Sequence, residues 1–264
     1  MLEYSVQVTI YWALFAFLYS QLLRGETFFR ANRLFLLGAL ALGLVSPVVQ
    51  PLFPAVPNQV SLVRLREITV RLEPMAGSFQ AWPVWKAVWW IYFTGVALQA
   101  LRLCWGLMRL TALIRKNSAK QLPGGFRLVR TPATDQPFSF FHWIFVPTDF
   151  EEKTYSGQNM LAHEQAHARG GHSVDVLLLE ILLVVAWFHP LVYWYRRALR
   201  TVHEYLADAS ASGQSTRREY GLLLLQQARF SCSVPIANHF FQNALKQRLM
   251  MLAKRSSARG RPRK

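Results

Sequence analysis

The chain has 264 residues, which is enough for one medium-sized domain and a few membrane spans. Hydrophobic residues make up 52% and aromatic residues 14%, including nine Trp, which is high for a soluble domain of this length. A net charge of +16 would also suit a nucleic-acid-binding protein, but long uncharged segments favour a basic membrane protein that faces anionic headgroups. We therefore expect membrane lipids as partners and no direct nucleic-acid binding.

Three apolar segments are long enough to cross a membrane, for which a helix needs about 20 apolar residues. Residues 4–23 and 34–63 contain no charged residue, and residues 82–101 contain only Lys86. Prolines interrupt the second segment, so its helix is expected to fray after Val49. The expected spans are 4–23, 34–53 and 82–101, within an N-terminal membrane region of residues 1–110.

The first segment could also be read as a cleaved signal peptide. Residues 1–5 carry Glu3 and no Lys or Arg, and the apolar stretch that follows is longer than a signal-peptide core. A retained span is therefore the favoured interpretation.

The distribution of basic residues indicates the orientation. Residues 24–33 carry three arginines, and residues 102–130 carry seven basic residues and no acidic one. The loop between the second and third segments is longer and of mixed charge. The positive-inside rule therefore places the N-terminus outside and everything after about residue 105 in the cytoplasm. Two cysteines form no disulfide framework, which suits a reducing compartment, and residues 254–264 form a basic, lipid-facing tail.

Residues 111–253 are expected to fold as one mainly helical domain with a small β element. Turn-rich sequence brackets a short strand at 126–130, and residues 138–146 are rich in β-forming residues and end at a proline. An apolar run at 174–187 is followed by His189-Pro190. Further helices are expected at about 157–169, 191–212, 218–230 and 243–254.

His163-Glu-Gln-Ala-His167 is an HExxH motif, which arises by chance in roughly 0.7% of sequences of this composition. On a helix the two histidines share a face and can bind one metal ion. Glu164 lies beside the metal and can take a proton from the attacking water. The alternative interpretation is a pair of ordinary core histidines.

Catalytic zinc needs a third protein ligand, and Glu204 can supply it. Asp208 lies one turn further along the same predicted helix and can accept a hydrogen bond from a ligand imidazole. A solvated acidic pair is the alternative. Because Glu204 must lie on the same side of the membrane as His163, residues 174–187 and 191–199 should form a hairpin, re-entrant or buried, and not a complete crossing.

Other polar residues near the motif are less specific. His172 and Asp175, just past the HExxH helix, are candidates to orient the metal ligands or to stabilise an oxyanion. Any one such histidine is more commonly a buried group whose hydrogen bonds are satisfied. Further candidate donors are His142, His189, His203 and Tyr205.

Five segments together carry a specific pattern: residues 24–33, Phe138-Ser-Phe-Phe-His-Trp-Ile-Phe-Val-Pro147, the HExxH motif, Trp187-Phe-His-Pro190 and His203-Glu-Tyr-Leu-Ala-Asp208. With this pattern the chain resembles the bacterial membrane metallopeptidases of the BlaR/MecR antirepressor type, in the gluzincin class. The resemblance implies zinc bound by His163, His167 and Glu204, Glu164 as catalytic acid/base, and a multi-pass protein of the bacterial inner membrane. It also implies a protein or peptide substrate, in some members a transcriptional repressor.

The resemblance further implies that Phe138, Ser139, Phe140 and Phe141 lie on an edge strand that binds an extended substrate, although an ordinary core strand is equally consistent. The antirepressor sensors carry a further span and an extracellular penicillin-binding domain, which this chain lacks, so we do not expect β-lactam sensing. The expected function is a cytoplasm-facing zinc endopeptidase in signal transduction. The alternatives are a housekeeping quality-control protease and a non-catalytic signalling scaffold.

Overall fold

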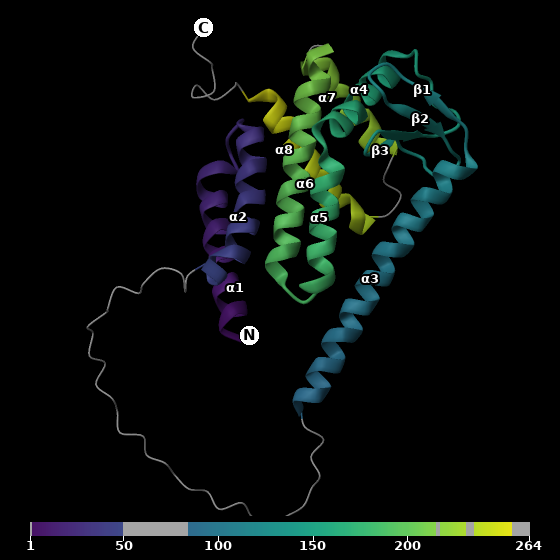
Figure 1. Cartoon of the computed structure of the whole chain (residues 1–264). Helices are drawn as coiled ribbons and strands as arrows, with labels where there is room; N and C mark the ends of the chain where they lie inside the picture. The colour runs from purple at the N-terminus through teal and green to yellow at the C-terminus, as the bar shows by residue number, and fades with distance from the viewer. Residues whose placement is uncertain (1, 50–83, 215–216, 231–234, 255–264) are drawn as a thin grey trace, which may run out of the picture.

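The computed structural model describes residues 2–49, 84–214, 217–230 and 235–254 (Figure 1). Helices dominate these residues, and one small sheet lies between the third and fourth helices, so the mainly helical prediction is confirmed. The helices are α1 (Leu2–Leu18) with its π-helical end η1 (Tyr19–Leu23), α2 (Phe29–Val49), α3 (Val84–Lys116), α4 (Tyr155–Gly170), α5 (His172–Val185), α6 (Pro190–Ala211), η3 (Ser212–Gln214), α7 (Arg217–Phe230) and α8 (Pro235–Ala253).

Three of these helices are long and apolar enough to cross a membrane: Glu3–Leu23, Phe29–Val49 and Trp85–Lys116. The second begins at Phe29 and not at residue 34, because the arginine-containing segment before it is already helical. The third runs on to Lys116, and at about 1.5 Å per residue its 33 residues exceed the thickness of a hydrocarbon core. Residues 50–53 and 82–83 of the expected spans lie outside the described residues.

The sheet has four strands, β1 (Ala119–Gln121), β2 (Arg127–Arg130), β3 (Phe138–Phe140) and β4 (Trp143–Val146), in the order β1-β2-β4-β3. β2 and β4 are parallel, and the other two pairs are antiparallel. Leu128, Ile144 and Val146 are fully buried beneath α4. β3 is an edge strand next to α4, so its outer edge is available for pairing.

α5 and α6 form the helical hairpin that the sequence predicted, with its turn at residues 186–189. Pro190 opens α6 at the position where a missing N–H costs nothing. Figure 1 shows the hairpin between the α1–α2 pair and the oblique α3. At its tip the His189 ring contacts Trp12, and its Nε2 lies 3.0 Å from the Thr9 hydroxyl of α1. The hairpin therefore runs alongside the candidate membrane helices and returns to the same end.

The Trp187 side chain of the hairpin turn packs directly against the backbone of α3. Trp187 donates a hydrogen bond to the Tyr92 carbonyl at 3.3 Å. A Cβ atom added to Gly95 would lie 2.2 Å from the Trp187 ring. No larger residue fits at this position unless the indole moves, so Gly95 allows the contact.

We predict that Gly95→Ala destabilises the protein, because overpacking at such a contact costs about 1–3 kcal/mol and outweighs the gain in helix propensity. Gly106→Ala is the matched control on the same helix, since nothing lies within 4 Å of its added Cβ. Thermal unfolding in detergent should show a lower Tm for Gly95→Ala only. Equal Tm values for the two variants would show that α3 is not packed on Trp187.

Candidate metal centre

The HExxH motif lies on α4, a helix with defined ends. Thr154 caps its N-terminus, where the hydroxyl accepts a hydrogen bond from the Gly157 amide at 3.1 Å. Gly171 ends the helix in the left-handed region, with φ of 64°, and so lets the chain turn directly into α5. This turn brings His172 and Asp175 of α5 back towards the histidines of α4.

Three donor groups converge between α4 and α6. Nε2 of His163 lies 3.1 Å from Nε2 of His167. The Glu204 carboxylate lies 3.5 Å from the first and 3.6 Å from the second of these nitrogens. A tetrahedral ion with bonds of 2.0–2.1 Å separates its ligands by about 3.3 Å, so these spacings fit such an ion. Within the described residues these three form the group able to hold a metal.

Asp208 lies behind His163, and its side chain is only 2% exposed. One carboxylate oxygen is 3.2 Å from Nδ1 of His163 and accepts a hydrogen bond from the Tyr220 hydroxyl at 2.9 Å. An imidazole that donates from Nδ1 presents the lone pair of Nε2 to the metal position. Asp208 thus selects the tautomer of His163 that can bind a metal.

Arg248 of α8 joins the two acidic residues of α6. It donates to both oxygens of Asp208, at 2.8 and 2.5 Å, and lies 3.0 Å from the Glu204 carboxylate. A bidentate arginine–carboxylate pair fixes the planes of both groups. Arg248 therefore connects the third ligand of the candidate metal centre to the residue that orients the first.

The pKa shifts reflect this charge pattern. Burial alone would lower the pKa of His163, but hydrogen bonds to Asp208 and Glu204 outweigh it and raise the pKa to about 9. Burial among protein atoms would raise the pKa of Glu204, yet His163 and Arg248 hold it below its usual range. For His167, burial and the neighbouring His163 lower the pKa to about 4. These shifts favour an ionised Glu204 and a neutral His167, whereas His163 must release a proton when it binds a metal ion.

A chain of contacts connects His167 to the membrane helix α2. Nδ1 of His167 lies 2.7 Å from Nδ1 of His172, whose ring stacks on His203 with centroids 4.1 Å apart. Nε2 of His203 is 2.7 Å from the Asp175 carboxylate. Arg33 donates to both oxygens of Asp175, at 2.6 and 3.0 Å, and to the Gly170 carbonyl at 2.6 Å. The orientation of one candidate ligand thus depends on an arginine of α2.

Glu164 lines the same cleft as the three donors and does not belong to the ligand group. Burial raises the pKa of its carboxyl, while His163 and a hydrogen bond from Ser139 of β3 act in the opposite direction. A carboxylate whose pKa is moved towards neutrality is suited to exchange protons with substrate near physiological pH.

A cleft of about 1290 Å³ contains the donor groups and Glu164. Phe138, Ser139 and Phe140 of the edge strand line one side, and residues of α6, α7 and α8 line the other. Phe141 is not among the described residues that line the cleft; it lies in the β3–β4 turn, with φ of 51°, and its amide donates to Ser173. The cleft can accept an extended chain between β3 and the donor groups.

The remaining candidate residues fall into two groups. His172, His203 and Asp175 belong to the contact chain described above. His142 lies in the β3–β4 turn and His189 at the hairpin tip, neither among the residues lining the cleft. The sequence did not indicate Arg33, Tyr220 or Arg248, whose partners lie far along the chain. The only signal for Arg33 was its place in the recognised segment 24–33.

Candidate membrane helices joined to a His/Glu metal site, with a glutamate and an edge strand beside it, define a membrane-associated metallopeptidase. The chain belongs to the BlaR1 peptidase M56 family, whose model matches residues 78–252. A comparison with curated protein sequences finds no match.

We predict that Arg33→Ala weakens metal binding about 10- to 100-fold, the usual effect of losing a group that orients a ligand. Asp175 would lose its bidentate partner, and the stacked histidines behind His167 would lose their fixed position. Arg30→Ala is the control, because Arg30 is an exposed arginine of the same helix. Titration with a chelator in competition measures the affinity. An unchanged affinity in Arg33→Ala would show that α2 does not support the site.

Proposed function

We propose that this chain is a zinc-dependent endopeptidase, with His163, His167 and Glu204 as ligands and Glu164 as general base. The observation that carries the proposal is the spacing of the three donor groups, between 3.1 and 3.6 Å, next to the partly buried Glu164. Two imidazoles and one carboxylate with an open fourth position are typical of catalytic zinc. When bound, zinc polarises the scissile carbonyl and lowers the pKa of the attacking water.

The other steps are assigned to residues of the chain. Glu164 accepts a proton from the attacking water and passes it to the leaving amine nitrogen. The raised pKa of its carboxyl favours both transfers, because the group can alternate between its two protonation states. The Ser139 hydroxyl holds the carboxylate on the side of the cleft that faces β3.

We assign substrate binding to the outer edge of β3. An extended peptide that adds to this strand would pass Phe138, Ser139 and Phe140, all of which line the cleft. It would then lie between the edge strand and the donor groups of α4 and α6. Such binding recognises peptide backbone and so suits a protein substrate.

The proposed location is the inner membrane of a bacterium, with the N-terminus outside and the cleft at the cytoplasmic face. The positive-inside rule supports it, because the segment between α1 and α2 and the basic end of α3 lie at the same end of the spans as α4, which lines the cleft (Figure 1). The α5–α6 hairpin would enter the membrane from this face as a re-entrant element covered by other helices.

We also propose a role in signal transduction. The contact chain from Arg33 to His167 gives α2 a direct influence on a metal ligand. A protein such as a transcriptional repressor would then be the substrate, and cleavage of one or a few proteins would distinguish this role from quality control. Glu164 argues against a non-catalytic scaffold, since a purely structural zinc site needs no base.

We predict that Glu164→Gln retains zinc and loses cleavage by at least about 100-fold, the usual contribution of a general base. The substitution keeps size and removes the basic carboxylate. Glu219→Gln, at an exposed carboxylate on α7, is the control and should cleave normally.

Added peptide should be cut by inside-out membrane vesicles and spared by right-side-out vesicles.

Normal cleavage by Glu164→Gln would refute the general-base role. Cleavage by right-side-out vesicles alone would refute the orientation and leave the enzymatic assignment intact.

A further inference from the structure

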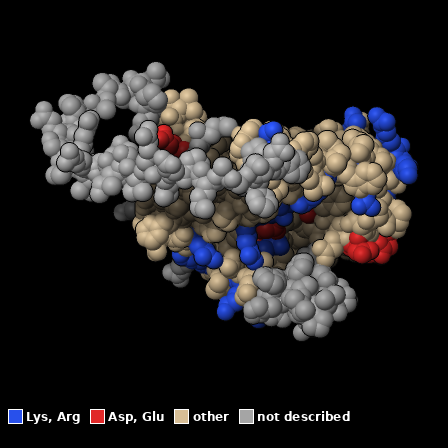
Figure 2. All heavy atoms as spheres, turned by 90° about the horizontal axis from the view of Figure 1, so that it is seen from below, with Lys and Arg blue, Asp and Glu red and all other residues tan. Residues whose placement is uncertain are grey.

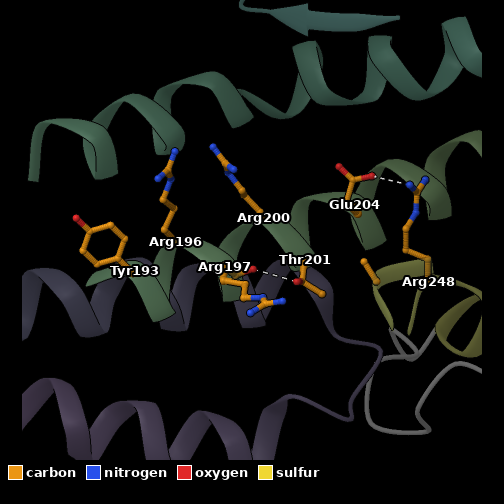
Figure 3. Close-up of a pocket in the computed structure, with 8 residues that line it drawn as sticks. Tyr193, Arg196, Arg197, Arg200, Thr201, Glu204 and Arg248 are labelled. Carbon is orange, nitrogen blue, oxygen red and sulfur yellow. Dashed lines mark hydrogen bonds and ion pairs between the residues drawn. The ribbon is translucent and has the colours of Figure 1, made fainter. Parts of the chain in front are cut away.

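Two arginines of α6 share a face with the third metal ligand. Arg196, Arg200 and Glu204 are spaced four residues apart, so their side chains follow one another along one side of the helix. Figure 3 shows the guanidinium groups of Arg196 and Arg200 on the same side of α6 as the Glu204 carboxylate. It shows Arg197 turned towards the opposite side.

The arginines around Glu204 differ in how fully they are engaged. Arg248 is bound to Asp208 and Glu204, and Arg196 pairs with Glu180 of α5, both largely covered by protein. Arg200 is different, because its side chain is 56% exposed and its nearest carboxylate oxygen, on Glu180, lies 3.9 Å away. A guanidinium at that distance retains hydrogen-bond donors for a ligand.

These residues enclose a pocket of about 340 Å³ between α6 and α8. Four arginines and one acidic residue contribute to its lining, which is therefore cationic even before a metal ion is added. Figure 2 shows basic and acidic atoms gathered in a hollow on the face seen from below, surrounded by mostly uncharged surface. The lining residues are Tyr193, Arg196, Arg197, Arg200, Thr201, Glu204, Ala244 and Arg248.

The pocket opens into the cleft that holds the metal centre. Arg200, Glu204 and Arg248 line both spaces, so a group bound at Arg200 belongs to a ligand that can also reach the metal. One helical step of four residues advances about 6 Å, which corresponds to about two residues of an extended peptide. Arg200 therefore faces a substrate residue near the scissile bond.

We propose that Arg200 forms a subsite for an acidic side chain of the substrate, about two residues from the cleaved bond. This inference rests on the proposed function and names a feature of its substrate. Arg196 holds Glu180 in its own ion pair, so Arg200 keeps its donors for a substrate carboxylate. The specificity arises because an amide or a cation at that substrate position would leave the guanidinium without a charged partner.

The first experiment identifies what the intact chain cleaves. Wild-type protein in detergent is incubated with zinc and a peptide library made from bacterial proteins, and mass spectrometry reads the cleavage sites. Asp or Glu should be enriched about two residues from the cleaved bond. Cleavage without any acidic preference within four residues of the bond would overturn the subsite while leaving the endopeptidase function in place.

The second experiment reverses the charge at the subsite. For the best-cleaved peptide, replacing the acidic residue by Lys should lower kcat/KM of wild type about tenfold to hundredfold. Arg200→Glu should reverse this preference and favour the Lys peptide, a gain that misfolding cannot produce. Arg218→Gln, which removes the same charge from an exposed arginine of α7 that lines neither the pocket nor the cleft, should behave like wild type. An unreversed preference in Arg200→Glu would contradict the proposal.

A binding measurement separates this proposal from the proposed function. Fluorescence anisotropy follows a labelled peptide with an Asp-Glu pair, and its Asn-Gln counterpart, on the zinc-loaded Glu164→Gln protein. Binding of the acidic peptide that Arg200→Glu abolishes supports the subsite even if wild type cleaves nothing. Equal binding of the acidic and the amide peptide would overturn the proposal. It would also be overturned if Arg200 were needed to bind phosphatidylglycerol in mixed micelles while the two peptides still bound equally well.

Discussion

The candidate metal centre imposes one constraint on the described chain: donor atoms from α4 and α6 must meet within about 3.6 Å. These helices are separated by the apolar α5, whose 14 residues are too few for a complete membrane crossing. The constraint forces α5 and α6 into a hairpin that returns to its starting side. The hairpin then packs against α1, α2 and α3, so the candidate membrane helices and the candidate metal centre share the same two supporting helices.

The Arg33–Asp175 ion pair shows how closely the candidate membrane helices and the candidate metal centre are connected. It joins α2 to the start of α5 and continues through His203 and His172 to His167, a candidate metal ligand. Arg248 of α8 has a corresponding role, because it forms ion pairs with both Glu204 and Asp208 of α6. Rearrangement of a membrane helix or of α8 would therefore disturb ligand geometry directly, which gives the proposed signalling role a physical route.

Local patterns in the sequence were sufficient for much of this structure. The HExxH spacing, the Glu204–Asp208 spacing and the Gly-Gly stop all act within a turn or two of helix, so they can be read from periodicity. Arg33 and Arg248 could not be found in this way, because their carboxylate partners lie 142 and 40 residues away. Tyr220 could not be found either, because it lies 12 residues from Asp208 and 57 from His163, the two groups that its hydroxyl contacts. The apolar pattern does not predict the early start of α2, because the first residues of this helix include Arg30, Asn32 and Arg33 and lie outside the apolar segment.

The central claim is that His163, His167 and Glu204 bind zinc together. Zinc content of the detergent-purified chain, with Glu204→Ala beside wild type, tests it most directly. The account predicts about one zinc per wild-type chain and a loss of most of it in Glu204→Ala, since two imidazoles alone make a weak site. No zinc in wild type after reconstitution, or full retention in Glu204→Ala, would contradict it.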